Sequence, residues 1–151
     1  MRWPAALIAM GAAIMAGVAA GGALPTDGRA LIGLTASAPD GELTLPSATA
    51  PPAALRLAVT GVENPSMQGV AIALRLRLNT PAGRIERALG AVALFPSNQP
   101  GNFTISLPAK VANLVAHAAG PVRLLVHLQS PTAGRMLIEP LKVSLAQPRW
   151  R

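Results

Sequence analysis

The sequence contains no cysteine and no tyrosine among its 151 residues, and aromatic residues make up only 3% of it. Without cysteine there is no disulfide framework, no thiolate metal site and no cysteine nucleophile. The small aromatic share leaves the core to leucine, valine, isoleucine and alanine. It also removes the interleaved aromatic and basic residues of single-strand nucleic-acid platforms, so nucleic acid is not an expected partner.

Acidic residues are scarce as well. Thirteen lysine and arginine residues stand against six aspartate and glutamate residues, which gives a formal charge of +7. Such a balance favours an acidic partner or an anionic surface. The alternative, and the simpler explanation, is a biased base composition, because the chain is rich in alanine, glycine, proline and arginine and nearly lacks lysine.

Residues suited to catalysis or metal binding form no recognisable motif. His117 and His127 are the only histidines and lack HxxxH or HxH spacing, no serine lies in a GxSxG elbow, and the six acids are scattered. No dinucleotide or P-loop glycine pattern follows a predicted strand. We therefore predict two surface histidines, no catalytic residue, no metal, no cofactor and a protein that is not an enzyme.

The N-terminal segment has the build of a secretory signal. Residues 3–26 carry no charge and follow Arg2, so we predict a signal helix and a signal peptide over residues 1–20, cleaved after Ala20 or, as a second choice, after Ala23. The alternative is an uncleaved anchor, because such an uncharged run is long enough to span a bilayer. Both predict an exported protein, periplasmic or extracellular, and only an uncleaved segment would keep it in contact with the membrane.

Residues 21–54 are rich in proline, alanine, serine and threonine, which predicts a tether ahead of the domain. Two short apolar pieces, residues 30–34 and 42–45, flank the turn signal Asp40-Gly41 and allow a small hairpin or an added edge strand. We place the domain itself at residues 55–147 and a tail at residues 148–151.

Residues 70–78 show the clearest pattern in the chain. Large aliphatic residues occupy the even positions and alanine or arginine the odd ones, which predicts a strand with one buried and one exposed face. Residues 108–118 show helical spacing. The period of two recurs at residues 55–60, 88–95, 103–107, 121–129 and 135–145. The sequence therefore predicts a mainly β fold, an antiparallel β-sandwich of about seven strands with one short helix.

Three side chains carry specific expectations within this pattern. Phe95 and Phe103 are expected in the core. Glu139 falls on the buried parity of the last strand, unless a bulge at Pro140 turns it outward, because proline cannot donate a ladder hydrogen bond.

Four arginines form the one local charge feature. Arg75, Arg77, Arg84 and Arg87 gather at one end of the predicted hairpin around residues 79–83, with Glu86 as an internal partner. They are candidate partner-binding residues that would dock an acidic protein surface. The alternative is a solvated strand face that keeps a sheet edge from pairing with other chains.

The order of the predicted strands resembles a known domain. Residues 59–63 (VTGVE), 70–79 (VAIALRLRLN), 90–95 (GAVALF), 103–105 (FTI), 124–131 (LLVHLQSP) and 136–143 resemble successive strands of the C-terminal β-sandwich behind the copper domain of tyrosinases and polyphenol oxidases. The histidine helices of the copper domain are missing. The resemblance implies a free-standing cover or assembly domain that docks on a type-3 copper oxidase and shields it or helps it mature.

Two other classes of function compete with this interpretation. One is a structural or ligand-binding envelope module held at the cell surface and binding polysaccharide, for which Phe95, Phe103 and Trp150 are the only aromatic contacts in the domain. The other is an enzyme with an unrecognised site.

Overall fold

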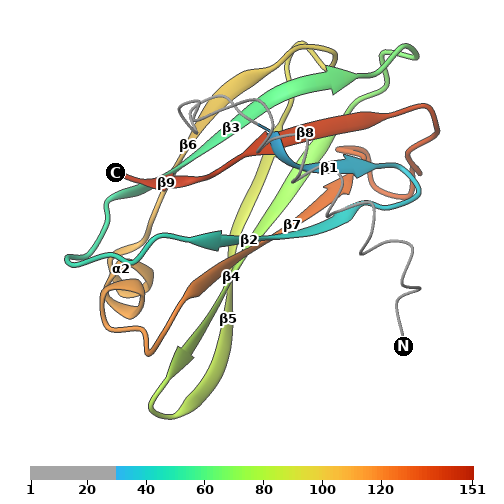
Figure 1. The fold of residues 1–151 in the computed structure, drawn as a ribbon. Coiled ribbons are helices and arrows are strands. Elements are labelled where there is room, and N and C mark those ends of the chain that lie inside the picture. Colours follow the sequence, from blue (N-terminus) through green and yellow to red (C-terminus); the bar gives the residue numbers. More distant parts are fainter. Residues whose placement is uncertain (1–29) are drawn as a thin grey trace, which may run out of the picture.

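Two antiparallel β-sheets pack on each other in the computed structural model, which describes residues 30–151 (Figure 1). Within these residues there are nine strands and one helix, so the predicted mainly β sandwich with a single short helix is confirmed. The predicted signal peptide and its two cleavage positions lie outside the described residues.

The two sheets divide the strands unequally. The five-stranded sheet has the order β1-β8-β3-β6, with β9 also paired to β3. Its strands are β1 (Ala30–Thr35), β8 (Lys142–Ala146), β3 (Ala54–Glu63), β6 (Gly101–Ser106) and β9 (Arg149–Trp150). The four-stranded sheet has the order β2-β7-β4-β5. Its strands are β2 (Asp40–Leu45), β7 (Val122–Gln129), β4 (Ala71–Thr80) and β5 (Gly83–Ala93).

Residues 70–78 form a strand with one buried and one exposed face, as their alternation predicts. Ile72, Leu74 and Leu76 are buried, whereas Arg75 and Arg77 lie on the outer face of the four-stranded sheet. On β7 the same period of two buries its apolar residues against the same core. Each fully buried leucine or valine contributes about 1.5–3 kcal/mol of hydrophobic stabilisation, so the aliphatic stripes of the strands are sufficient to hold the layers together.

The helix also forms where helical spacing predicts it. Helix α2 (Ala109–Ala116) follows Pro108 and buries Val111, Ala112 and Val115. Proline suits this position because a residue before the first turn needs no intrahelical N–H donor. Figure 1 shows α2 at the end of the sandwich where the β4–β5 hairpin turns.

From residue 30 onward the segment predicted as a tether contains edge strands, one of the alternatives that the sequence allowed. Strands β1 and β2 do not form a hairpin with each other: β1 pairs with β8 in one sheet and β2 pairs with β7 in the other. Both are edge strands, and residues 36–39 carry the chain from one layer to the next. Leu34, Leu43 and Leu45 are buried, so these short apolar pieces belong to the core and the domain includes residues before position 55.

The C-terminal part of the prediction also needs correction. Strand β8 begins at Lys142, not at residue 135, and residues 130–141 form a loop. Pro140 lies just before strand β8, where no neighbouring strand needs a backbone N–H donor from it. The expected tail contains β9, which pairs with β3. Strand β5 likewise begins earlier than predicted, at Gly83.

One of the two phenylalanines expected in the core is not there: Phe95 is 95% exposed in the loop after β5, whereas Phe103 is partly buried against the core. Glu139, for which the sequence left a buried and an outward position open, is exposed and lies in the loop before β8. Its carboxylate accepts hydrogen bonds from the backbone N–H of Ser37, the Ser37 hydroxyl and the backbone N–H of Leu141. These bonds, led by that of the Ser37 backbone, lower the pKa of Glu139, and they tie the β1–β2 connection to the β7–β8 loop.

Replacing Gly41 by alanine should overpack the contact between the sheets. A β-carbon at Gly41 would lie 2.8 Å from both Ile32 Cδ1 and Leu34 Cδ2, so those side chains would have to move. Overpacking of this kind costs about 1–3 kcal/mol. We expect Gly41→Ala to lower the free energy of unfolding by that amount in urea denaturation. At Gly61 the nearest atoms to such a carbon are 3.9 Å away, so Gly61→Ala is the matched control and should not destabilise the protein.

The Glu139 carboxylate should make stability fall in acid. Because folding lowers its pKa below the ordinary 4.5, its contribution is complete above that value and is lost as the pH falls through the folded-state pKa. We expect the urea midpoint of Glu139→Gln to decline less than that of the wild type between neutral pH and pH values below 4.5. Glu63→Gln is the control. Parallel declines in all three proteins would contradict this role of Glu139.

Candidate functional site

The outer face of the four-stranded sheet carries a group of charged side chains that form ion pairs with one another. In register, Arg77 lies opposite Glu86 on β5 and opposite Arg123 on β7. Arg75 lies opposite Leu125, and Leu125 opposite Glu42 of β2. Residues directly opposite each other in an antiparallel pair point to the same face. These side chains therefore share one surface, although they come from four strands.

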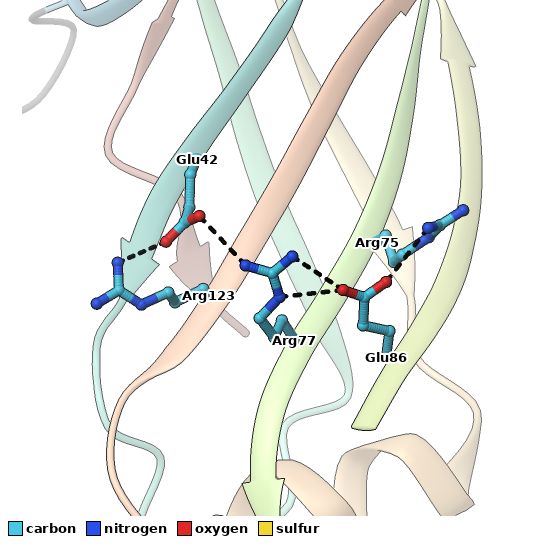
Figure 2. A network of polar contacts seen from close by, with 5 residues as sticks. All are labelled: Glu42, Arg75, Arg77, Glu86 and Arg123. Atoms are coloured by element: carbon cyan, nitrogen blue, oxygen red, sulfur yellow. Dashed lines mark hydrogen bonds and ion pairs between the residues drawn. The ribbon is translucent and has the colours of Figure 1, made fainter. Parts of the chain in front are cut away.

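The charged side chains on this face form a continuous chain of alternating sign (Figure 2). The Nε and Nη2 atoms of Arg77 both lie 3.0 Å from Glu86 Oε1, and Arg75 Nη1 lies 3.2 Å from Glu86 Oε2. Arg77 Nη1 reaches Glu42 Oε2 at 3.6 Å, and Arg123 binds the other oxygen of Glu42. The hydrogen bond from Arg77, together with that from Arg75, lowers the pKa of Glu86. We call these five residues the Arg-Glu network.

The four arginines proposed from the sequence do not form one patch. Arg75 and Arg77 join the network, and Glu86 is their partner as predicted. Arg84 lies on the same face opposite Asn79 and has no hydrogen bond or ion pair with any described residue. Arg87 lies opposite buried Leu76, hence on the other face, and its Nη1 donates to the backbone oxygen of Glu86.

Two members of the network escaped the sequence analysis. Glu42 belongs to the segment interpreted as a tether, and Arg123 lies on a strand 81 residues later in the chain. No local pattern links them. The outward parity of Arg123 on β7 was the only available signal.

A hollow of about 740 Å³ lies on this face beside the network. Small and aliphatic side chains, Ala73, Ala88 and Leu125, occupy neighbouring positions in its lining. Arg75, Arg77, Glu42, Asp40 and His127 also line it, and Arg75 lies in register between Leu125 and Ala88. The site therefore brings small and aliphatic side chains next to the charged network.

The histidines lie on the surface, as predicted. His127 Nδ1 lies 2.7 Å from Asp40 Oδ1, a pair between β7 and β2 that the sequence did not suggest. His117 Nδ1 lies 2.8 Å from the backbone oxygen of Asn113 at the end of α2. Among the lining residues of the hollow there is no serine, threonine, cysteine or lysine to serve as a nucleophile beside His127.

Metal ligands do not cluster in residues 30–151. Within that part of the chain no group of three or more histidine, cysteine, aspartate or glutamate residues is placed to hold a metal ion. In the same residues no helix is long and apolar enough to cross a membrane.

Comparison with known proteins adds no relative: no family model, no curated protein and no solved structure matches this chain. The resemblance to the tyrosinase C-terminal domain stays a prediction.

Breaking the network at its centre should weaken the four-stranded sheet. Arg77 is the only member that contacts both glutamates, so Arg77→Gln removes the ion pair between β4 and β2 and one of the two ion pairs between β4 and β5, leaving that of Arg75 with Glu86. We expect a lower urea midpoint for Arg77→Gln, and a gap from the wild type that narrows in 1 M salt because salt screens exposed charges. Arg84→Gln, which removes an equal charge from the same face, should leave the midpoint unchanged. A salt-independent loss would show that packing of the Arg77 stem matters instead.

Proposed function

We propose that this chain is a non-enzymatic β-sandwich that binds a protein partner through the outer face of its four-stranded sheet. The observation that carries the proposal is the hollow above Ala73, Ala88 and Leu125 with the Arg-Glu network along its edge. An apolar centre within a polar rim is the usual anatomy of a protein interface. The lining residues offer apolar and charged side chains for contact.

The network supports this proposal because it holds the rim in place before a partner arrives. Arg77 is fixed by two glutamates, and each glutamate is fixed by a second arginine. Side chains already ordered lose less conformational entropy on binding. The face therefore favours a partner that accepts a fixed pattern of charge.

The charge on the rim suggests what the partner presents. The network contains three arginines and two glutamates, which leaves one net positive charge. Arg75 is its outermost cation: its side chain is 58% exposed and contacts a single oxygen of Glu86. A carboxylate of the partner would find donors there, and such complementary charge guides association and sets its orientation.

A type-3 copper oxidase is the partner that we propose, on the basis of the resemblance to the tyrosinase C-terminal domain. Docking would place the four-stranded sheet over the oxidase and shield its active site or assist its maturation. The proposed setting is outside the cytoplasm, periplasmic or extracellular, because the N-terminal segment has the build of an export signal.

A binding titration with a purified tyrosinase-type copper oxidase from the same organism tests the proposal. We expect association at micromolar concentration or tighter. Leu125→Asp, which puts a charge on the apolar floor, should weaken it by at least about tenfold, the effect of about 1.4 kcal/mol.

Thr44→Asp is the matched control for Leu125→Asp. Thr44 is exposed on the outward side of β2, opposite Arg123, and is not among the lining residues of the hollow. We expect Thr44→Asp to bind as the wild type does. Thermal unfolding of each variant checks that the fold is retained. Absence of wild-type association at micromolar concentration, or equal losses in the two variants, would contradict the proposal.

A further inference from the structure

A second hollow, of about 500 Å³, lies where strand β7 ends and the β7–β8 loop begins. Figure 1 shows this loop at the end of the sandwich away from α2. The lining residues come from the end of β7, from residues 130–137 of the loop, and from Ala36 and Pro39 of the β1–β2 connection. We call it the loop hollow. It adjoins the hollow of the proposed partner site, because His127 and Gln129 line both.

Hydrogen bonds hold the walls of the loop hollow in place. The Leu128 N–H donates to the backbone oxygen of Pro39 at 2.9 Å, which fixes the β1–β2 connection on the end of β7. Within the loop, the Thr132 N–H donates to Ser130 Oγ at 3.2 Å, and the Arg135 N–H donates to the backbone oxygen of Thr132 at 3.2 Å. A ligand would therefore meet a site that is already formed, as most small-molecule sites are.

The loop hollow is lined by an arginine and by no carboxylate of the described chain. Arg135 is that arginine, and its side chain has no hydrogen bond or ion pair with any residue in the range 30–151. Two acids of the surrounding segments already have partners: Asp40 is paired with His127, and each oxygen of Glu139 accepts a backbone N–H. A guanidinium in this setting suits a carboxylate ligand, because it donates through two parallel N–H groups.

Neutral hydrogen-bond donors also line the loop hollow. Ser130 Oγ accepts the hydrogen bond from Thr132, so the Ser130 hydroxyl can still donate its own proton. The side-chain amide of Gln129 has no hydrogen bond with a described residue and can donate as well. The lining therefore offers donors to the oxygens of an anion in addition to those of Arg135.

The remaining lining is largely apolar. Its members are Leu128, Pro131, Ala133, Met136 and Leu137. Met136 is 86% exposed, and a flexible thioether side chain adapts to ligands of irregular shape. No aromatic residue of the described chain lines the hollow, so it provides no stacking surface for a sugar ring or a base. These features favour a short aliphatic group attached to the anionic head.

We propose that the loop hollow binds a small aliphatic carboxylate, with the carboxylate on the Arg135 guanidinium and the hydrocarbon chain against Met136 and Leu137. Its volume of about 500 Å³ lies within the ~300–1,000 Å³ of ordinary ligand pockets. The inference does not rest on the proposed protein partner. The small and aliphatic residues of the partner site, Ala73, Ala88 and Leu125, do not line the loop hollow.

Titration of the isotope-labelled protein with sodium hexanoate, followed through its amide NMR signals, tests the inference. We expect shift changes concentrated at residues 127–137 and a dissociation constant of about 1–10 mM, as suits a small ligand with one ion pair. Hexanamide keeps the aliphatic chain and lacks the charge. It should bind about fivefold more weakly, the effect of about 1 kcal/mol from an exposed ion pair.

Variants of Arg135 separate the ion pair from the apolar contact. Arg135→Gln should weaken hexanoate binding by about the same factor of five and leave hexanamide binding unchanged, whereas Arg135→Lys keeps the charge and should retain most of the affinity. Arg84→Gln is the matched control, because it removes an equal charge from an exposed arginine outside the loop hollow. We expect Arg84→Gln to bind as the wild type does. Amide signals unchanged away from each substitution show that the fold is kept.

Several results would overturn the assignment. Shift changes centred on Ala73, Ala88 and Leu125 would assign hexanoate to the partner site. Equal affinities for hexanoate and hexanamide would exclude the ion pair with Arg135, and equal losses in Arg135→Gln and Arg84→Gln would mean that only net charge matters. Tighter binding of inorganic phosphate at the same amides would make the ligand a free oxyanion. Absence of localised shifts up to about 50 mM hexanoate would refute the site itself.

Discussion

The close contact between two aliphatic sheet faces is the constraint on which the rest of the molecule depends. The buried core is made of leucine, valine, isoleucine and alanine, with two buried prolines, Pro52 and Pro148, and with Asn64 as the one buried polar residue in the described chain. There is no disulfide and no fully buried aromatic ring to add stability. A core of branched aliphatic side chains reaches interior packing density only if the layers approach closely, and Gly41 allows that approach beneath Ile32 and Leu34.

One end of the sandwich is ordered by polar side chains in place of a core. The Asn64 amide donates to the backbone oxygens of Gln68 and Ser97, and the Gln68 side chain both donates to and accepts from the backbone of Ile138. Three loops far apart in sequence are thereby joined. The same loops present Met67, Phe95, Met136 and Ile138, four of the five large apolar side chains exposed in residues 30–151. Because their backbones are held, these side chains are exposed by the fold itself and not by a local lack of structure.

Periodicity predicted the central elements because each can be recognised within its own residues. The alternation of β4 and β7 and the helical spacing of α2 are local, and all three form as expected. For strands β1 and β2 the sequence allowed an added edge strand but also a hairpin, because a proline-rich segment with two short apolar pieces does not reveal its partners. Each completes the edge of a different sheet, and that arrangement depends on β8 and β7, about a hundred residues later.

The residues of the candidate site could likewise be predicted only as far as local periodicity reaches. Outward parity was correct for Arg75 and Arg77, whereas Arg87 lies on the opposite face because it is an odd number of residues away from Arg84 and Glu86 on the same strand and pairs with buried Leu76. Glu42 and Arg123 could be added only once strand order was known. A pattern of period two assigns faces within a strand, but it does not say which strands are neighbours.

Arginine therefore has two different roles in this fold, and the number of arginines alone does not distinguish them. On the four-stranded sheet, Arg75, Arg77 and Arg123 are matched by two glutamates and serve to order a rim. On the five-stranded sheet, Arg56 lies opposite another arginine with no acid in the adjoining register positions. A biased base composition accounts for how many arginines the chain contains, but it does not account for the position of Asp40, Glu42 and Glu86 on one sheet face. The four-stranded sheet therefore presents an outer face on which charges of both signs are paired, and this pairing, which depends on strand order, is what distinguishes it from the outer face of the five-stranded sheet.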